Sequence, residues 1–410
     1  MTFAAIPALQ HHPELLAHFG PKIMATQYDG RNVPDTMKHG LTIGMAMTEK
    51  QGGSDVRTNS TRAFPIGQEG PGAAYELVGH KWVGAAPMCD AFLILAQAPG
   101  GLSCFLVPRW RPDGSKNAIH IQQLKNKMGN VANASSECEL RGAFGWLVGQ
   151  EGRGVRTIIE MVAITRYDCM IGSSSGMRQA TVQAIHHARH RSAFGATLVD
   201  QPLMQNVLAD LAVESEAAMT MTMRLARSLD QQDNEHERLL TRILTPIGKY
   251  WICKRTPNHA YEAMEVIGGM GVMENTIMPR LFREAPVNAI WEGSGNVQCL
   301  DIIRALNKEP EVLSAYFVEV EQAMGADARF DQAVHSLKAL FSTIKPDDYQ
   351  YSARYLADHL AKVMQGALLL QYAPAEVADA FCASRLSADT AANYGTAART
   401  IIDRCFNYNN

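Results

Sequence analysis

The sequence predicts a mainly helical α+β protein, in which a β domain is followed by a helical bundle and a helical extension. Between residues 41 and 150, short runs rich in β-formers, such as AYELVGHKWVGAA and AFLILAQA, are separated by Gly, Pro and Asp. From residue 151 the apolar residues recur at helical spacing with few breakers. Strands and helices do not alternate along the chain, which disfavours a Rossmann fold.

The composition sets limits on the class of protein. The 410 residues suffice for two or three domains, and 47% hydrophobic with 19% charged residues is typical of a globular chain. No apolar run approaches the roughly 20 residues of a membrane helix, and the N-terminus lacks a signal peptide pattern. The eight cysteines are scattered singly, so we predict no metal site and expect a reducing, cytoplasmic location.

The elements follow in a simple order. Residues 1–40 are weakly patterned. Helices are expected over 154–191, 202–230 and 238–269, the third interrupted at Pro246 and Pro257, and a fourth runs from about 296 to 306. Roughly a hundred further helical residues follow. The predicted domains are 1–40, 41–150, 151–307 and 308–410.

Two glycine-rich stretches are candidate binding loops. GMAMTEKQGGSDVRT (44–58) can present backbone N–H groups and hydroxyls to an anion or a heteroaromatic ring, although for an isolated loop a turn capped by Ser54 and Asp55 is the favoured interpretation. The stretch 265–284 has glycines at 268, 269 and 271, and alone it reads as a helix stop.

RSAFG (191–195) ends a helix in a basic cluster. The guanidinium group of Arg191 can bind a phosphate, or Arg191 can be a cation placed favourably at the C-terminus of a helix.

The stretch VNAIWEGSGNVQCLD (287–301) contains the strongest catalytic candidate. Glu292 stands between a tryptophan and Gly-Ser-Gly, whereas a surface glutamate would sit among other polar residues. An exposed glutamate is too weak a base to take a proton from carbon, and enclosure beside Trp291 would make it a stronger base.

Taken in this order, the motifs resemble the acyl-CoA dehydrogenase flavoprotein family. AMTEKQGGSDVRT matches its first signature, 265–284 its second, and WEGSGN stands where the family carries its catalytic Glu-Gly motif. NASSECEL and CLDIIRALNK look like the AidB-like, alkylation-response subgroup. The resemblance implies a β-barrel or sandwich middle domain, a four-helix bundle over 151–307, and residues 1–40 as the last part of an N-terminal helical domain.

The resemblance also implies the site and the chemistry. Glu292 would be the base that takes the α-proton of a short or branched acyl-CoA, similar to isovaleryl-CoA, while a hydride passes to flavin N5. Thr48, Ser54 and Arg166 would contact the substrate, and a homo-oligomer, expected to be a tetramer, would share its FAD sites. The implied FAD contacts are Met45, Met47, Thr48, Ser54, Val83, Ala85, Arg191, Phe194, Gly268, Gly269, Gly271, Ile290, Trp291, Gly293, Ser294, Gly295 and Asn296.

Three positions depart from the family pattern. Ala85 stands where members usually carry a hydroxyl that contacts flavin N5, and its loss would cost about 1 kcal/mol of control over the flavin. Ala163 stands where an Asp precedes Arg166 by three residues, and Glu265 replaces a frequent Gln. The first two departures argue for slow turnover.

Two other functions stay open. The subgroup resemblance implies an alkylation-response flavoprotein with weak or vestigial dehydrogenase activity that binds DNA through its C-terminal helices. The net charge of −3 and the outnumbered cations after residue 312 do not support DNA binding. These cations are Arg329, Lys338, Lys345, Arg354, Lys362, Arg385, Arg399 and Arg404. A third reading is a scaffold in which flavin is structural or absent.

Overall fold

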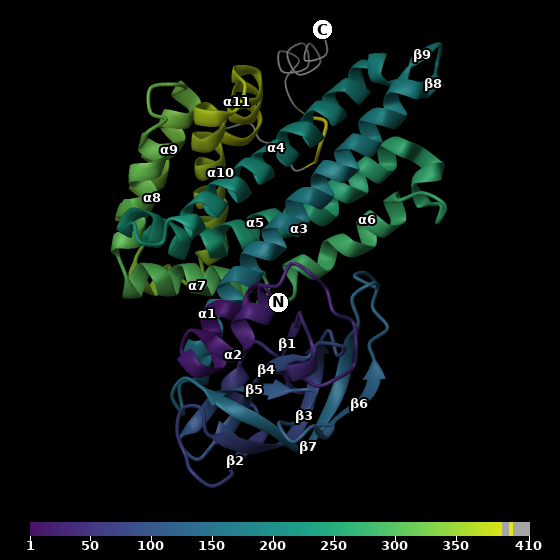
Figure 1. The fold of residues 1–410 in the computed structure, drawn as a ribbon. Helices are drawn as coiled ribbons and strands as arrows, with labels where there is room; N and C mark the ends of the chain where they lie inside the picture. The colour runs from purple at the N-terminus through teal and green to yellow at the C-terminus, as the bar shows by residue number, and fades with distance from the viewer. Residues whose placement is uncertain (388–392, 397–410) are drawn as a thin grey trace. The chain divides into compact units, whose positions relative to one another are not determined.

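The structure, a computed structural model, describes residues 1–387 and 393–396 (Figure 1). The chain divides into two compact units, Met1–Thr165 and Arg166–Asn410. The first unit holds a seven-stranded sheet and the second is built almost entirely of helices. This is the mainly helical α+β fold that the sequence predicts.

The sheet of the first unit curls back on itself. Its strand order is β1-β3-β2-β4-β5-β7-β6, and additional pairings join β1 to β4 and β3 to β7. Most pairs are antiparallel, whereas β1 runs parallel to β4. The strands are β1 (Ile43–Thr48), β2 (Arg62–Pro65), β3 (Ala74–Ala85), β4 (Ala91–Ala98), β5 (Gly101–Pro108), β6 (Ile119–Leu124) and β7 (Ser135–Val148).

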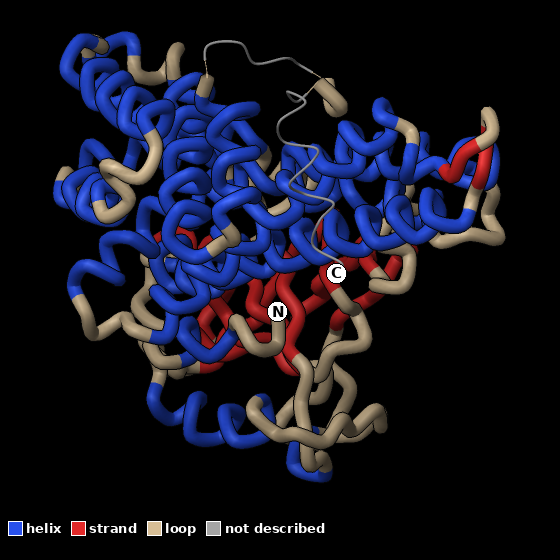
Figure 2. Tube along the Cα trace, turned by 90° about the horizontal axis from the view of Figure 1, so that it is seen from above, coloured by secondary structure: helices blue, strands red, loops and turns tan. Residues whose placement is uncertain are grey.

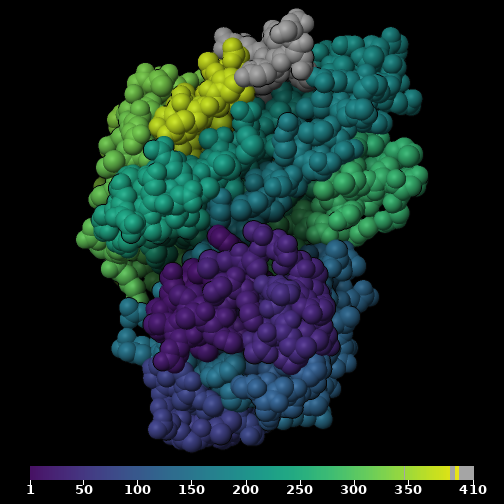
Figure 3. All heavy atoms as spheres, in the orientation of Figure 1, coloured from purple at the N-terminus to yellow at the C-terminus, as the bar shows by residue number. Residues whose placement is uncertain are grey.

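Two short helices cover one side of this sheet. In α1 (Ala5–Leu9) and α2 (Pro13–Ile23), side chains such as Phe19 pack with Leu93 of β4 in one buried apolar cluster. Pro13 at the first turn suits the start of a helix, where its missing N–H removes no bond. In Figure 3 the N-terminal residues, coloured purple, lie on the visible face of this unit next to its blue residues.

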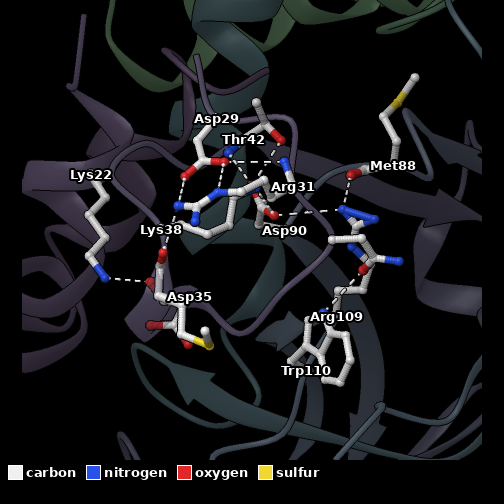
Figure 4. Close-up of polar contacts among 12 residues, drawn as sticks. Lys22, Asp29, Arg31, Asp35, Lys38, Thr42, Met88, Asp90, Arg109 and Trp110 are labelled. Carbon is white, nitrogen blue, oxygen red and sulfur yellow. Dashed lines mark hydrogen bonds and ion pairs between the residues drawn. The ribbon is translucent and has the colours of Figure 1, made fainter. Parts of the chain in front are cut away.

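A buried ion pair fixes the entry to β1. Lys38 Nζ lies 2.6 Å from Asp90 Oδ1, and Asp90 Oδ2 accepts the backbone N–H of Thr42 at 2.9 Å (Figure 4). Arg31 and Asp29 brace the same segment. Because both members of the Lys38–Asp90 pair are buried, the segment cannot leave without exposing or unpairing a charge. The position at which β1 begins is therefore fixed.

The second unit is a bundle of long helices. Figure 2 shows these helices in blue and the small β8–β9 ribbon (Ser192–Ala193 with Ala196–Thr197) as red strands at the end of two of them. The unit boundary falls within α3. The helices are α3 (Gly154–His190), α4 (Pro202–Asp230), α5 (Glu235–Ile267), α6 (Met278–Glu284), α7 (Gly295–Lys308), α8 (Glu311–Glu321), α9 (Ala328–Thr343), α10 (Ala353–Tyr372) and α11 (Ala375–Phe381).

The predicted interruption of the third helix is wrong. Helix α5 continues through both Pro246 and Pro257. A proline removes one intrahelical hydrogen bond and bends the helix, but it does not end a helix that tertiary packing holds in place. Leu240, Ile243 and Ile247 are fully buried, so burial of this face outweighs the local cost.

The C-terminal extension shares the core of the bundle. Ile243 of α5, Ile302 of α7, Val312 of α8, Phe330 of α9 and Leu360 of α10 belong to one buried cluster. The extension is therefore part of the structure that carries α5 and α7. No helix in the described part of the chain combines the length and apolar character that crossing a bilayer requires.

Candidate functional site

Glu292 lies in a strained turn just before α7. Its φ angle is 59°, the left-handed region that residues with a side chain rarely adopt, and Gly293 follows with φ 98°. A non-glycine residue there costs of order 1–2 kcal/mol, so this conformation persists only where the surroundings determine it. The glutamate itself is half-buried.

Two buried side chains hold the carbonyl groups of this turn. Lys249 Nζ donates to the carbonyl oxygens of Trp291 at 2.7 Å and Gly293 at 2.6 Å, so it holds the residues on both sides of Glu292. Gln298 Nε2 donates to the carbonyl oxygens of Glu292 and Gly293, each at 3.0 Å. Burial lowers the pKa of the Lys249 ammonium.

Arg166 adds a third donor. Its Nε donates to the Glu292 carbonyl oxygen at 2.9 Å, and its Nη1 lies 2.8 Å from Asp301 Oδ2. Asp301, on α7, also binds Arg242 at 3.0 Å. Arg166, predicted to contact substrate, is thus buried and supports the backbone of Glu292 in this structure.

The extension reaches the start of α7. Arg354 Nε of α10 donates to Asn296 Oδ1 at 2.8 Å, and Asp358 accepts the Tyr250 hydroxyl at 2.9 Å. Ser294, at the N-cap of α7, makes no capping bond with its side chain, and the first turn of α7 carries no acidic residue. The first turn of α7 thus contains no acidic residue to balance its partial positive charge. Ser294, Gly295 and Asn296, all predicted FAD contacts, lie here.

Other predicted cofactor residues of the second unit are open to solvent. Phe194 is 99% exposed, sits in the β8–β9 turn with φ 53°, and follows the exposed Arg191. Among the described residues, no side chain packs over this aromatic ring to account for its left-handed backbone.

The glycines at the end of α5 behave differently from one another. Gly268 ends the helix with φ 70°, and nothing lies within 4 Å of where a side chain of Gly269 would begin. A side chain at Gly271 would meet the Met264 carbonyl oxygen at 2.3 Å. A ligand can therefore approach the backbone closely at 268–269, whereas a side chain at Gly271 would collide with the backbone of α5. Ile290, also predicted to contact FAD, is 65% exposed.

In the first unit, β1 and β3 bring four predicted cofactor residues together. Met45 pairs with Ala85 and Thr48 pairs with Val83, and the register shifts between these two pairs. The loop after β1 folds back closely, since a side chain at Gly53 would meet Thr48 Oγ1 at 2.5 Å. Met47 is fixed through its carbonyl oxygen, and Ser54 is exposed on the same loop.

Glu49 and Lys81 fix this strand pair, and the sequence analysis did not find them. The two side chains are buried and lie 2.7 Å apart, and Glu49 also accepts bonds from the backbone and hydroxyl groups of Ser60 and Thr61. Burial alone would raise the pKa of the Glu49 carboxyl, but the bonds from Lys81 and Thr61 outweigh it and lower that pKa to about 2. The available signal was a charged residue in each of two β motifs, MTEK and GHKW.

The residues of both units suit FAD. FAD offers a large ring system, a pyrophosphate and an adenosine, and so needs an apolar strand edge, cations and closely approachable backbone. Taken by itself, the first unit has an apolar strand edge at β1–β3 that suits a ring system. Taken by itself, the second unit has the exposed Arg191 and Phe194 and the open backbone at 268–269, which suit a pyrophosphate and an adenosine.

Comparison with known proteins identifies the family. Residues 44–143 match the family model "Acyl-CoA dehydrogenase, middle domain", and residues 152–307 match "Acyl-CoA dehydrogenase, C-terminal domain". The chain is 46% identical over 386 residues to AidB of Escherichia coli, covering 93% of this chain and 69% of AidB. The chain belongs to the acyl-CoA dehydrogenase family. This result confirms the predicted fold, the FAD-dependent oxidoreductase class and FAD as the cofactor of that class.

Solved structures agree with this assignment. The crystal structure of Caenorhabditis elegans ACDH-11 in complex with C11-CoA superposes with a TM-score of 0.85 at 29% identity, covering 93% of this chain and 70% of that one. An acyl-CoA dehydrogenase from Bacillus anthracis, at 19% identity and TM-score 0.67, covers 83% of this chain and 66% of that one, and supports the fold. The chain thus spans about two thirds of the length of these relatives.

Three of the six cations after residue 312 in the described residues are engaged in ion pairs. Arg329 pairs with Asp327 and Asp379, Lys338 with Glu321, and Arg385 with Asp210 and Glu214. Arg399 and Arg404 lie outside the described residues. A duplex-binding face requires several unpaired cations together, and within the described part of the extension these pairs work against one.

Proposed function

We propose that this chain carries an FAD-dependent acyl-CoA dehydrogenase site for short or branched acyl-CoA substrates, with Glu292 as the base. The observation that carries the proposal is the backbone of Glu292, which is held in the left-handed region by bonds to the carbonyl oxygens of residues 291–293. Residues held in a strained backbone conformation cluster at active sites, where the strain fixes the position of a functional side chain. The C11-CoA in the ACDH-11 complex supports an acyl-CoA as the ligand, whereas the short or branched acyl chain rests on the resemblance in the sequence.

In this proposal the chain's residues remove one proton and exclude water. The Glu292 carboxylate takes the α-proton of the acyl thioester and keeps it. Trp291, whose Nε1 donates to Asn288 Oδ1 at 3.0 Å, is fixed next to that carboxylate in the chain and contributes an apolar face. Bound FAD supplies the two-electron acceptor for the hydride that leaves the β-carbon.

Cofactor binding is proposed to involve a second copy of the chain. Arg191 and the bare ring of Phe194 have the chemistry to bind a pyrophosphate and an adenine, and their exposure suits contact with a cofactor held mainly by another subunit. We therefore propose a homo-oligomer, a tetramer, that shares its FAD sites and functions in the cytoplasm.

The test is a reductive titration of the purified chain with FAD. Anaerobic isovaleryl-CoA should bleach the flavin absorption band in the parent. Glu292→Gln should retain FAD and slow this reduction at least 100-fold, the lower range for loss of a general base. Glu274→Gln, which changes an exposed carboxylate, serves as the control. Equal reduction rates in Glu292→Gln and the parent would remove Glu292 from the role of base.

The alternative is an AidB-like alkylation-response flavoprotein whose dehydrogenase activity is weak. Ala85 and the identity to AidB favour this reading. FAD that stays bound while isovaleryl-CoA fails to bleach it in the parent would support the alternative. DNA binding has no described basic surface to support it, so any affinity should be low and should fall steeply with salt.

A further inference from the structure

The turn at Glu292 is held by more bonds than its position before α7 requires. The carbonyl oxygens of Trp291, Glu292 and Gly293 all accept hydrogen bonds from side chains. Gln298 lies on α7 itself, but Lys249 comes from α5, 43 residues earlier in the chain. A turn that only connected two helices would need neither a buried ammonium nor a strained glutamate.

Lys249 has the most demanding position among these donors. Its side chain is 1% exposed, and its described hydrogen bonds go to two backbone carbonyls that flank one residue. Burying an ammonium costs several kcal/mol, and carbonyl dipoles repay this less fully than a carboxylate would. The cost must therefore be offset by what the ammonium holds in place.

The geometry assigns Lys249 as a positioning residue, which holds Glu292 in its left-handed conformation and so aims the carboxylate, with Gln298 as its second support. Its bond to the Trp291 carbonyl oxygen fixes the peptide group before Glu292, and its bond to the Gly293 carbonyl oxygen fixes the peptide group after Gly293. The peptide group between them carries the Glu292 carbonyl oxygen, which Arg166 and Gln298 bind, so φ and ψ of Glu292 are held from both sides. Without the Lys249 bonds the turn relaxes toward a conformation with negative φ, and the Glu292 side chain leaves from a different direction. The catalytic consequence rests on the proposed function, whereas the clamp itself does not.

A thermodynamic cycle tests the clamp without any assay of activity. The four proteins are the parent, Lys249→Met, Glu292→Gly and the double variant. Glycine adopts positive φ freely, so the clamp has little strain to hold in the Glu292→Gly background. Lys249→Met should lower Tm in the parent, and by at most half as much in that background. An equal decrease in both backgrounds would overturn the proposal, because Lys249 would then be an ordinary structural contact.

A comparison of two variants tests whether the backbone at position 292 is strained. Glu292→Ala removes the carboxylate but keeps a side chain on left-handed backbone. Glu292→Gly should therefore melt about 1 °C or more above Glu292→Ala in a chain of this size. A lower Tm for Glu292→Gly would mean that the turn stores no strain, which also overturns the proposal.

The catalytic consequence is measured in the FAD-loaded protein. Lys249→Met should slow flavin reduction by isovaleryl-CoA about 100-fold, the cost of a displacement near 1 Å, while the acyl-CoA Kd stays within about threefold. Lys249→Arg, which keeps cationic donors, should recover part of the rate. Lys362→Met removes a partly buried ammonium from α10 and should keep the parent rate. A Kd that weakens as much as the rate falls would contradict positioning.

The proposal remains testable if Lys249→Met does not fold or if the parent flavin is not reduced. If Lys249→Met does not fold, Gln298→Leu takes its place in the same cycle, with the equally buried Gln365→Leu as its control. If the parent flavin is not reduced by isovaleryl-CoA, the proposed function fails, and the Tm cycle still decides whether Lys249 clamps Glu292.

Discussion

Each unit contains one almost fully buried lysine next to predicted site residues, and the two lysines bind different partners. Lys81 in the first unit binds the Glu49 carboxylate and the Leu95 carbonyl oxygen, each at 2.7 Å. Lys249 in the second unit binds two carbonyl groups of the Glu292 turn. Burial lowers the pKa of both ammonium groups.

The partner determines what each lysine contributes. Opposite charges in a buried pair compensate one another, so removing one member leaves an uncompensated charge and costs much stability. A lysine that binds carbonyl groups leaves only neutral acceptors behind. Lys81 should therefore matter most for folding, and Lys249 most for the geometry of one turn.

The largest expected effect comes from breaking the first pair. Lys81→Met leaves the Glu49 carboxylate buried without its cation and should lower the free energy of unfolding by about 3–5 kcal/mol. Urea unfolding followed by circular dichroism measures this loss. Lys50→Met, at an exposed site, should change it by less than about 0.5 kcal/mol. The double variant Lys81→Met with Glu49→Leu should recover most of the loss, and no recovery would show that the charge is not its cause.

The pH dependence of stability sharpens the same contrast. The pKa of Glu49 is about 2 in the folded chain and has an ordinary value of 4.5, so the folded state favours the charged form. Its contribution is fully present above pH 4.5 and is lost as the pH falls toward 2. At 1.36 kcal/mol per pH unit, this difference corresponds to about 3 kcal/mol. Glu49→Gln should flatten the stability curve in this window. An unchanged slope would show that other carboxylates govern acid unfolding.

The sequence predicted the features that depend on neighbouring residues and missed those that depend on contacts between distant parts of the chain. Runs rich in β-formers predicted the β domain, but they did not predict that Lys81 is fully buried while neighbouring Trp82 is 44% exposed, because strand register decides which face is buried. Glu292 was identified since its flanking glycines are local signals. Lys249 was missed, because its partners lie more than 40 residues away and the surrounding helix pattern reads as core.

Arg191 is an exposed cation and so contrasts with both lysines. Arg191→Ala should leave Tm unchanged and weaken FAD retention, since a charge-assisted contact is worth about 1.5–3 kcal/mol, or roughly 10–150-fold in Kd. FAD released on dilution, followed by fluorescence, measures the change. Arg189→Ala, in the same exposed cluster, is the matched control. If both variants retain FAD equally well, Arg191 is only a cation at the end of a helix.

The smallest expected effect tests the strand that Lys81 supports. Ala85 lies on β3 opposite Met45, half-buried, where a serine hydroxyl would add one hydrogen-bond donor without filling a packed site. Ala85→Ser should speed flavin reduction by isovaleryl-CoA about fivefold, which corresponds to about 1 kcal/mol, and leave the stability within about 0.5 kcal/mol. Ala74→Ser, at the other end of β3, should change neither quantity. A faster reaction in Ala85→Ser alone would show that the missing hydroxyl limits this chain. An unchanged rate would mean that the alanine is no handicap, and that control of the reaction lies with the turn that Lys249 holds.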